Sequence, residues 1–422
     1  MSSNSLPTTV SCNGRDYRFP SQPTVVVCMD GSEPGYIEAA IEAGLAPNCK
    51  RLMETGSNLL AKSVVPSFTN PNNMSIITGR PPAVHGIAGN YFYDPETGEE
   101  VMMNDARFLR APTIMHAFHD AGARVAVITA KDKLRALLTK GIEFGPGRAV
   151  GFSSEKADQV STVQNGIDDA LGLVGMPLPE VYSGELSEFV FAAGVKLLET
   201  FKPDLMYLST TDYIQHKAAP GSEIANTFYA TIDRYIGELD AAGATLVITA
   251  DHGMNDKHLS NGEPDVIYLQ SLFDEWLGKP QAEGGARVIL PITDPYVVHH
   301  GALGSFATVY LPNDANADEL IGKLRAIDGI DEAMNKADAA ERFELPTDRI
   351  GDLVVVSGQH KVLGTSADRH DLSGLTEPLR SHGGITEQTV PMIANRHITV
   401  DSGQELRNFD VFDVALNRCQ SA

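Results

Sequence analysis

Short apolar runs alternate with helical segments along the part of the chain that ends near Ala250. The runs are continuous rather than alternately polar, which is typical of strands buried on both faces of a parallel sheet. We predict strands at Thr24–Met29, Leu59–Val65, Arg124–Thr129, Leu205–Ser209 and Ala244–Ala250. We predict helices at Tyr36–Glu54, Pro112–Ala121, Ser187–Phe201 and Glu223–Ala242. This order predicts an α/β fold with a mostly parallel sheet flanked by helices.

The pattern changes between about Lys257 and Thr376. Strand-like runs there surround a single helical stretch without strict alternation, and they are Arg287–Leu290, Ala307–Leu311 and Leu353–Val356 around Ala317–Ile327. A chain of 422 residues is long enough for two domains. We therefore predict a core formed by residues 1–256 and 377–422, with a smaller α+β cap domain inserted at residues 257–376.

The beginning of the chain is polar up to Pro23 and lacks the basic stretch and apolar run of a signal peptide. Asn13 and Gly14 lie between two strand-like segments, which predicts a short opening hairpin. The four cysteines show no CxxC spacing and are interpreted as free thiols. Because the apolar runs are also too short to span a bilayer, we expect a cytoplasmic protein.

The formal net charge of −22 argues against nucleic acid or an anionic membrane surface as a partner. A small anionic substrate would meet the same repulsive field, and bound metal ions would supply the local positive charge that it needs. The oligomeric state cannot be read from the sequence, and a homodimer is the commonest arrangement for a soluble enzyme.

Two polar motifs directly follow predicted strands, at the sheet edge where α/β proteins bind ligands. Asp30 ends the first strand, and the Asp-His-Gly motif at 251–253 ends the last. Adjacent residues of an extended chain point in opposite directions, so Asp251 and His252 could serve different metal ions or different faces of one site. Each motif, taken alone, could equally form a turn or a helix cap.

Three further motifs carry metal-binding or nucleophilic side chains. Thr69 lies where a helix begins, so its hydroxyl would sit at the positive end of the helix dipole, although it could merely cap the helix. Asp212 and His216 are spaced i, i+4 and would share one helical face, either as ligands of one ion or as a surface pair. His382 lies in a Gly-flanked loop and, taken alone, is weak evidence for a metal site.

Together these motifs supply three imidazoles with carboxylate and hydroxyl oxygens, enough for two adjacent metal ions that each keep an open position. Mixed histidine and carboxylate ligands favour zinc, although manganese or iron could occupy the same ligands. Other histidines fit no such pattern, and we interpret His116, His119, His299 and His300 as packing or surface residues.

The order of the motifs resembles the alkaline phosphatase superfamily, and particularly its nucleotide pyrophosphatase/phosphodiesterase branch. The residues at the places of that family's metal ligands and nucleophile are Asp30, Thr69, Asp212, His216, Asp251, His252 and His382. The segments 66–73, 78–80 and 85–87 resemble the nucleophile region of the same branch, and Asn90 lies where the branch has an asparagine that contacts a phosphoryl oxygen.

This resemblance implies an alkaline-phosphatase-like core that holds two Zn²⁺ per chain. One ion would be bound by Asp30, Thr69, Asp251 and His252, and the other by Asp212, His216 and His382. It also implies that Thr69 is the catalytic nucleophile and forms a phosphothreonine intermediate, while Asn90 binds the phosphoryl group.

The segments 86–94, 100–105 and 130–135 resemble those members of the branch that hydrolyse a small carboxylated phosphonate. Lys131 and Lys133 follow a predicted strand at spacing i, i+2, so both would point the same way. We expect them to hold the substrate carboxylate, although a solvated helix start is the ordinary interpretation of such a charge run. Arg287, at the entry to the cap, is a further cation that could join them.

Two alternatives remain open at this point. A nucleotide pyrophosphatase/phosphodiesterase would use the same two-zinc site, with Tyr91 and Tyr93 as an aromatic slot for a base. A non-catalytic binding protein of this fold would be favoured by loss of the nucleophile or of a ligand, and none is missing.

Overall fold

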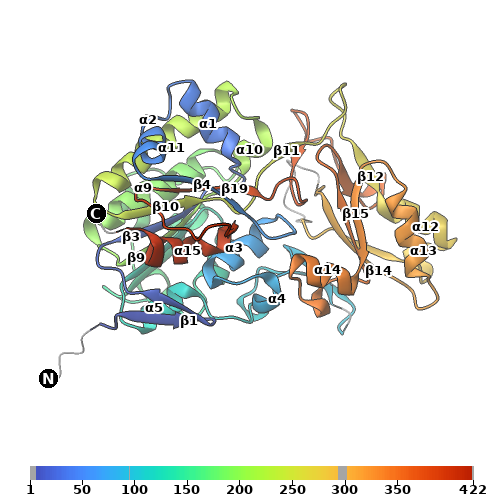
Figure 1. Ribbon diagram of the computed structural model, residues 1–422, viewed down its shortest axis with the longest axis horizontal. Coiled ribbons are helices and arrows are strands. Elements are labelled where there is room, and N and C mark those ends of the chain that lie inside the picture. The colour runs from blue at the N-terminus through green and yellow to red at the C-terminus, as the bar shows by residue number, and fades with distance from the viewer. Residues whose placement is uncertain (1–5, 95, 293–301, 421–422) are drawn as a thin grey trace.

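The computed structural model describes residues 6–94, 96–292 and 302–420. An eight-stranded sheet forms the centre of the larger part of the molecule, on the left in Figure 1. Its strands run in the order β20-β4-β19-β10-β3-β9-β7-β8. Their bounds are β3 Thr24–Cys28, β4 Ser57–Lys62, β7 Val125–Thr129, β8 Ala149–Ser153, β9 Leu205–Ser209, β10 Thr245–Thr249, β19 Thr389–Ala394 and β20 Leu406–Arg407.

Five neighbouring strands, from β10 to β8, are all parallel, whereas β19 is antiparallel to both β10 and β4. The sheet is therefore mostly parallel, and the predicted fold class is confirmed. Strand β8 was missed because its short sequence includes Gly151 and carries a weak strand signal.

Helices cover both faces of this sheet. Side chains alternate between the faces along each strand, so Val25 and Val27 belong to one apolar cluster, while Val26 and Cys28 belong to the other. The helices of the first face are α1 Pro34–Glu42, α2 Pro47–Thr55, α9 Glu185–Thr200 and α11 Glu223–Ala241. Those of the second face include α3 Thr69–Thr78, α5 Ile114–Asp120, α6 Asp132–Leu138 and α15 Val411–Asp413.

The single helix predicted at Tyr36–Glu54 is wrong, because the structure has two helices there. Gly44 adopts φ +75° after the end of α1, and Pro47 begins α2. A residue with positive φ ends a helix, and proline is favoured in the first turn of the next one. The other three predicted helices agree with α5, α9 and α11 within a few residues.

A four-stranded antiparallel sheet, β13-β14-β16-β15, lies in the second part of the molecule, on the right in Figure 1. Its elements are β13 Arg287–Ile289, β14 Phe306–Tyr310, β15 Ile330–Asn335, β16 Leu353–Ser357, α12 Leu269–Leu277, α13 Ala317–Arg325 and α14 Lys336–Phe343. The three strands and the helix predicted in this segment are confirmed, while the exact domain boundaries stay a prediction.

Short pairs of strands complete the fold. The opening hairpin consists of β1 Thr9–Cys12 and β2 Arg15–Arg18, as predicted, and a second hairpin of β5 Tyr91–Asp94 and β6 Glu99–Met102. The chain leaves the core through β11 Asn255–Asp256 and returns through β18 Arg380–Ser381, which pair antiparallel. The strands β12 Val266–Tyr268 and β17 Val362–Gly364 form a parallel pair.

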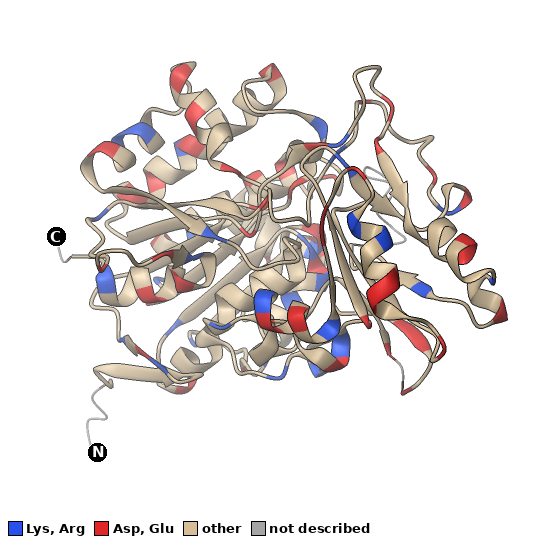
Figure 2. Ribbon diagram, turned by 45° about the vertical axis from the view of Figure 1, so that its right-hand side comes forward, with Lys and Arg blue, Asp and Glu red and all other residues tan. Residues whose placement is uncertain are grey.

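Charged residues lie mainly on helices and loops of both parts, and most of the strand ribbon belongs to uncharged residues (Figure 2). The four cysteines are free thiols. Among the helices of the described residues, none has both the length and the apolar character needed to cross a bilayer.

Candidate active site

Four of the predicted site residues lie at the carboxyl ends of three neighbouring strands, β10, β3 and β9. Asp30 follows β3, Asp212 follows β9, and Asp251 with His252 follows β10. Because these strands are parallel, their ends meet at one edge of the sheet, and the three carboxylates converge there.

The structure brings six of the predicted ligands together in two groups, in each of which one ligand atom per residue lies within 4.8 Å of the others. The first group is Asp30, Asp251 and His252, and the second is Asp212, His216 and His382. Helix α10, Tyr213–Lys217, begins directly after Asp212 and places His216 one turn further on, as the spacing predicts.

Short distances connect imidazole nitrogens with carboxylate oxygens in both groups. His252 Nε2 lies 3.2 Å from Asp30 Oδ1, His216 Nε2 lies 3.0 Å from Asp212 Oδ2, and His382 Nε2 lies 3.5 Å from the same Asp212 oxygen. All of these side chains are buried or nearly so.

The other ring nitrogen of each histidine contacts a backbone carbonyl oxygen. His216 Nδ1 lies 2.8 Å from the Arg380 carbonyl oxygen, and the corresponding distances are 2.9 Å from His252 to Gly253 and 2.7 Å from His382 to Ser67. A carbonyl oxygen can only accept, so each Nδ1 carries the proton and donates. In a neutral ring the Nε2 lone pair is then directed at the carboxylates, which is the arrangement of metal-binding histidines.

Burial and mutual repulsion control the ionisation of the carboxylates. Burial raises the pKa of Asp30 well above its usual range, and the neighbouring Asp212 and Asp251 raise it further. Burial alone would lower the pKa of His252, but Asp251 and Asp30 raise it to about 10. Without a cation, protons must neutralise this cluster.

Asp30 Oδ1 lies 3.2 Å from His252 Nε2, and while that ring is neutral it accepts no hydrogen bond from the described residues. A buried acceptor without a partner is costly, and a divalent cation would satisfy it while neutralising the clustered carboxylates. The mixed imidazole and carboxylate donors also suit zinc. The residues present therefore fit metal binding.

Thr69 is the first residue of α3, and its Oγ1 lies 3.5 Å from His252 Nε2. Asn73, one turn further on, donates from Nδ2 to the Thr69 carbonyl oxygen and to Asp251 Oδ2, both at 3.1 Å. Its own Oδ1 accepts from Tyr207 and Ser209 at 2.8 and 3.0 Å. Sequence reasoning missed Asn73, although an asparagine one turn after the predicted nucleophile was a usable signal.

A cavity of about 440 Å³ opens in front of these groups. Predicted residues that line it are Asp30, Thr69, Asn90, Lys131, Lys133, Asp212, His216 and His382. Asn90 Oδ1 accepts from the backbone N–H of Asn70 at 3.1 Å, which leaves its amide N–H groups to donate elsewhere. Lys131 Nζ donates to the Val181 carbonyl oxygen at 3.2 Å and lies 5.1 Å from the Tyr182 ring centroid.

Arg287 and the two tyrosines of the predicted aromatic slot are not among the residues that line this cavity. The Arg287 guanidinium pairs with Glu100 at 2.7 Å and lies 4.3 Å from the Tyr93 ring centroid, and the Tyr91 hydroxyl donates to Glu100 at 2.8 Å. Arg287, on β13, therefore contacts side chains of the β5–β6 hairpin, and the structure does not bring it to the two lysines.

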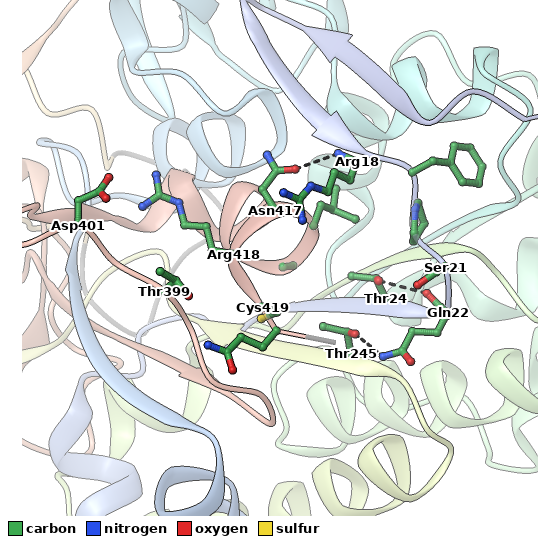
Figure 3. A pocket seen from close by; sticks show the side chains of 15 residues that line it. Arg18, Ser21, Gln22, Thr24, Thr245, Thr399, Asp401, Asn417, Arg418 and Cys419 are labelled. Atoms are coloured by element: carbon green, nitrogen blue, oxygen red, sulfur yellow. Dashed lines mark hydrogen bonds between the residues drawn. The ribbon is translucent and has the colours of Figure 1, made fainter. Parts of the chain in front are cut away.

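A larger cavity, of about 830 Å³, lies at the opposite edge of the sheet, beside Thr24 and Thr245 where β3 and β10 begin (Figure 3). Its other polar lining residues include Arg18, Asp401 and Arg418. It contains none of the predicted site residues, so size alone would select the wrong cavity.

The remaining histidines named above lie elsewhere. His116 and His119 are on α5, where His116 pairs with Asp120 at 3.1 Å. His299 and His300 lie outside the described residues.

Known proteins share both the sequence pattern and the fold. Residues 24–384 match the family described as type I phosphodiesterase / nucleotide pyrophosphatase. The chain is 62% identical to phosphonoacetate hydrolase of Sinorhizobium meliloti 1021, covering 97% of this chain and 98% of that one, with a TM-score of 0.94. Crystal structures of that enzyme contain phosphonoformate or phosphonoacetate.

More distant relatives show the fold alone or match only partly. Murine ectonucleotide pyrophosphatase / phosphodiesterase 5 is 16% identical over 95% of this chain and 98% of its own, with a TM-score of 0.61. A pyrophosphatase/phosphodiesterase of Schizosaccharomyces pombe is 24% identical over 69% of this chain. The chain spans 56% of that relative and 42% of ectonucleotide pyrophosphatase/phosphodiesterase 1 of Saccharomyces cerevisiae, about half their length.

The chain therefore belongs to the type I phosphodiesterase / nucleotide pyrophosphatase family of the alkaline phosphatase superfamily, and it is a hydrolase. This confirms the resemblance found in the sequence. Within the family, it is similar to phosphonoacetate hydrolase over almost its whole length.

Proposed function

We propose that this protein hydrolyses the carbon–phosphorus bond of phosphonoacetate to acetate and phosphate, with two Zn²⁺ ions and a phosphothreonine intermediate on Thr69. The observation that carries the proposal is the composition of the 440 Å³ cavity. Thr69 and ligands of both candidate metal groups line the same cavity as Lys131 and Lys133, so it offers groups for a phosphonate and for a carboxylate.

The first metal group with Thr69 would hold one ion, and the second group would hold the other. When bound, zinc supplies the positive charge that lowers the pKa of the Thr69 hydroxyl and neutralises the phosphoryl oxygens. The position of Thr69 at the start of α3 adds the positive end of the helix dipole to the same place.

Thr69 Oγ1 attacks phosphorus, and the new oxygen–phosphorus bond forms as the carbon–phosphorus bond breaks. The hydroxyl proton passes to solvent, and the leaving carbon takes one proton from solvent to give acetate, so this step has no net change in protons. A water molecule then attacks phosphorus, which releases phosphate and restores the hydroxyl. Asn90 donates from its amide to a phosphoryl oxygen, since its own oxygen already accepts from Asn70.

A carbanion is a poor leaving group, so its charge must be delocalised into the adjacent carboxylate. Lys131 and Lys133 hold that carboxylate and stabilise the enolate-like charge as the bond breaks. The Val181 carbonyl oxygen and the Tyr182 ring orient the Lys131 ammonium group. Arg287 could join the lysines only after its pair with Glu100 is broken, so it is not assigned to this step.

The nucleotide pyrophosphatase/phosphodiesterase alternative needs a surface for a base. In the described residues, the tyrosines predicted for that surface do not line the cavity, which favours the smaller substrate.

The test measures phosphate released from phosphonoacetate and nitrophenol released from a nitrophenyl phosphodiester by the zinc-loaded protein. We expect Thr69→Ala to abolish phosphate release and the Lys131→Ala/Lys133→Ala variant to reduce it strongly. Lys156→Ala changes an exposed lysine that does not line the cavity and serves as the control. Fast diester cleavage that ignores the two lysines, with no phosphate from phosphonoacetate, would assign the protein to the phosphodiesterases instead.

A further inference from the structure

Arg380 is a buried arginine that stands outside the proposed reaction. Its side chain is only 6% exposed, and it lies on β18, two residues before the predicted ligand His382. It does not line the 440 Å³ cavity, so a direct contact with substrate does not explain it. A buried guanidinium needs partners for its five N–H groups, and those partners identify its role.

The guanidinium of Arg380 contacts three different segments of the chain. Its Nε donates to the Gln215 carbonyl oxygen at 2.9 Å, and its Nη2 donates to the Tyr36 hydroxyl at 3.1 Å. Its Nη1 forms an ion pair with Asp256 on β11, the residue opposite Arg380 in the β11–β18 pair.

The backbone of Arg380 makes a fourth contact, because its carbonyl oxygen accepts from His216 Nδ1 at 2.8 Å. Arg380 therefore holds α10 twice, through the carbonyl of Gln215 by its side chain and through the ring of His216 by its backbone. The carbonyl contact makes Nδ1 the donor and turns His216 Nε2 towards Asp212, while the side chain of Arg380 keeps that carbonyl in place against α10.

Helix α10 depends on such contacts because it is short. It spans only Tyr213–Lys217, and a helix of one turn has no stability of its own. Further contacts also hold it: the Gln215 amide donates to Ser32 and Tyr229 at 3.2 and 2.8 Å, and the Tyr36 hydroxyl contacts the Gln215 carbonyl oxygen at 3.2 Å.

We propose that Arg380 is a positioning residue that sets the geometry of the second metal group, by fixing α10 to the strand that leads to His382. This proposal rests on the proposed metal site but not on the identity of the substrate. Partners that orient a metal-binding histidine typically change metal affinity about 10–100-fold when they are lost. The effect belongs to the second group, since Arg380 contacts no ligand of the first.

The test is isothermal titration calorimetry, in which metal-free protein is titrated with Zn²⁺ and the affinity of each bound zinc ion is measured. In Arg380→Ala we expect one zinc equivalent to bind about 10–100-fold more weakly, while the other keeps its affinity. Arg380→Lys keeps the charge but has no planar fork, so it should restore the lost affinity only in part. Lys196→Ala, which removes an exposed ion pair with Glu199 on α9, is the control and should leave both affinities unchanged.

A double variant shows which of the two metal groups holds the zinc ion that binds more weakly. His382→Ala alone should weaken the second metal group, and adding Arg380→Ala to it should cause little further loss, because both changes act on one unit. Equal weakening of both equivalents, or full affinity in both Arg380 variants, would overturn the proposal. If Arg380→Ala does not fold, the same comparison is made with Arg380→Lys. Selective weakening without turnover of phosphonoacetate would refute the proposed substrate and leave this inference intact.

Discussion

The imidazole rings of His252 and His382 stack face to face, with centroids 3.6 Å apart and an angle of 8° between their planes. The two residues precede and follow the predicted cap in the sequence, and they belong to different metal groups. The stack therefore places the two groups side by side, as a pair of ions acting on one phosphoryl group requires.

The first prediction concerns zinc content. His382→Ala removes one of three protein ligands from the second group, so we expect dialysed protein to retain about one zinc less per chain than the unchanged enzyme. Metal analysis after dialysis measures it, with His116→Ala, on α5, as a control that should keep its full content. Loss of all metal would mean that the groups bind only together.

The second prediction concerns Asn73, which joins the nucleophile segment to a metal ligand. Asn73→Ala should lower kcat for phosphonoacetate by about 10–100-fold, because partners that orient metal ligands have effects of this size. KM should change less, since Asn73 does not line the cavity. Asn48→Ala removes an amide that binds Asp233 far along the chain and should keep normal kinetics. A rise in KM with unchanged kcat would contradict this role.

Site residues could be predicted from sequence where a metal-binding side chain directly follows a strand. Asp30 and Asp251 come immediately after apolar runs, so the parallel sheet alone brings them together. Arg380 escaped prediction because its partners are distant in sequence and reach it only through tertiary packing. The same holds for the contact of Asn73 with Asp251, although its place one turn after Thr69 was readable. The break between α1 and α2 was readable in Gly44 and Pro47, but a long apolar pattern concealed it.

The third prediction concerns Tyr182, whose ring lies beside the Lys131 ammonium group. A cation–π contact contributes about 0.5–2 kcal/mol, so Tyr182→Ala should raise KM for phosphonoacetate by about 2–30-fold. Inhibition by inorganic phosphate should not change, because phosphate has no carboxylate to bind the lysine. Leu178→Ala, an exposed change in the same loop, is the control. Equal weakening of phosphate and phosphonoacetate binding would argue against a carboxylate-specific role.

The fourth prediction concerns the fully buried ion pair of Lys257 and Glu387, 3.0 Å apart. Glu387 also accepts from the backbone N–H of Gly384 through its side chain, and from that of Gly253 through its carbonyl oxygen. Removing one partner strands a buried charge, so Glu387→Gln should lower the free energy of unfolding by about 3–5 kcal/mol. The free energy of unfolding of Lys257→Met/Glu387→Leu should fall by less than the sum of the losses in Lys257→Met and Glu387→Leu. Urea unfolding of these three variants, of Glu387→Gln and of the unchanged protein tests this. Strict additivity would show that the pair does not interact.

The fifth prediction concerns Glu33, whose pKa is raised from 4.5 to about 7 by burial, with Glu387 and Asp256 adding repulsion and Arg380 opposing it. A folded-state pKa above the unfolded one stabilises the fold below pH 4.5, and that stability is lost as pH rises towards 7. Residue 33 does not titrate in Glu33→Gln. The free energy of unfolding of this variant, relative to that of the unchanged protein, should therefore rise by up to about 3 kcal/mol between pH 4.5 and 8. Urea unfolding at both pH values measures the difference, with Glu38→Gln, exposed on helix α1 that follows Glu33, as the control. A Glu33→Gln effect that is equal at both pH values would show that the Glu33 carboxyl does not ionise in this range.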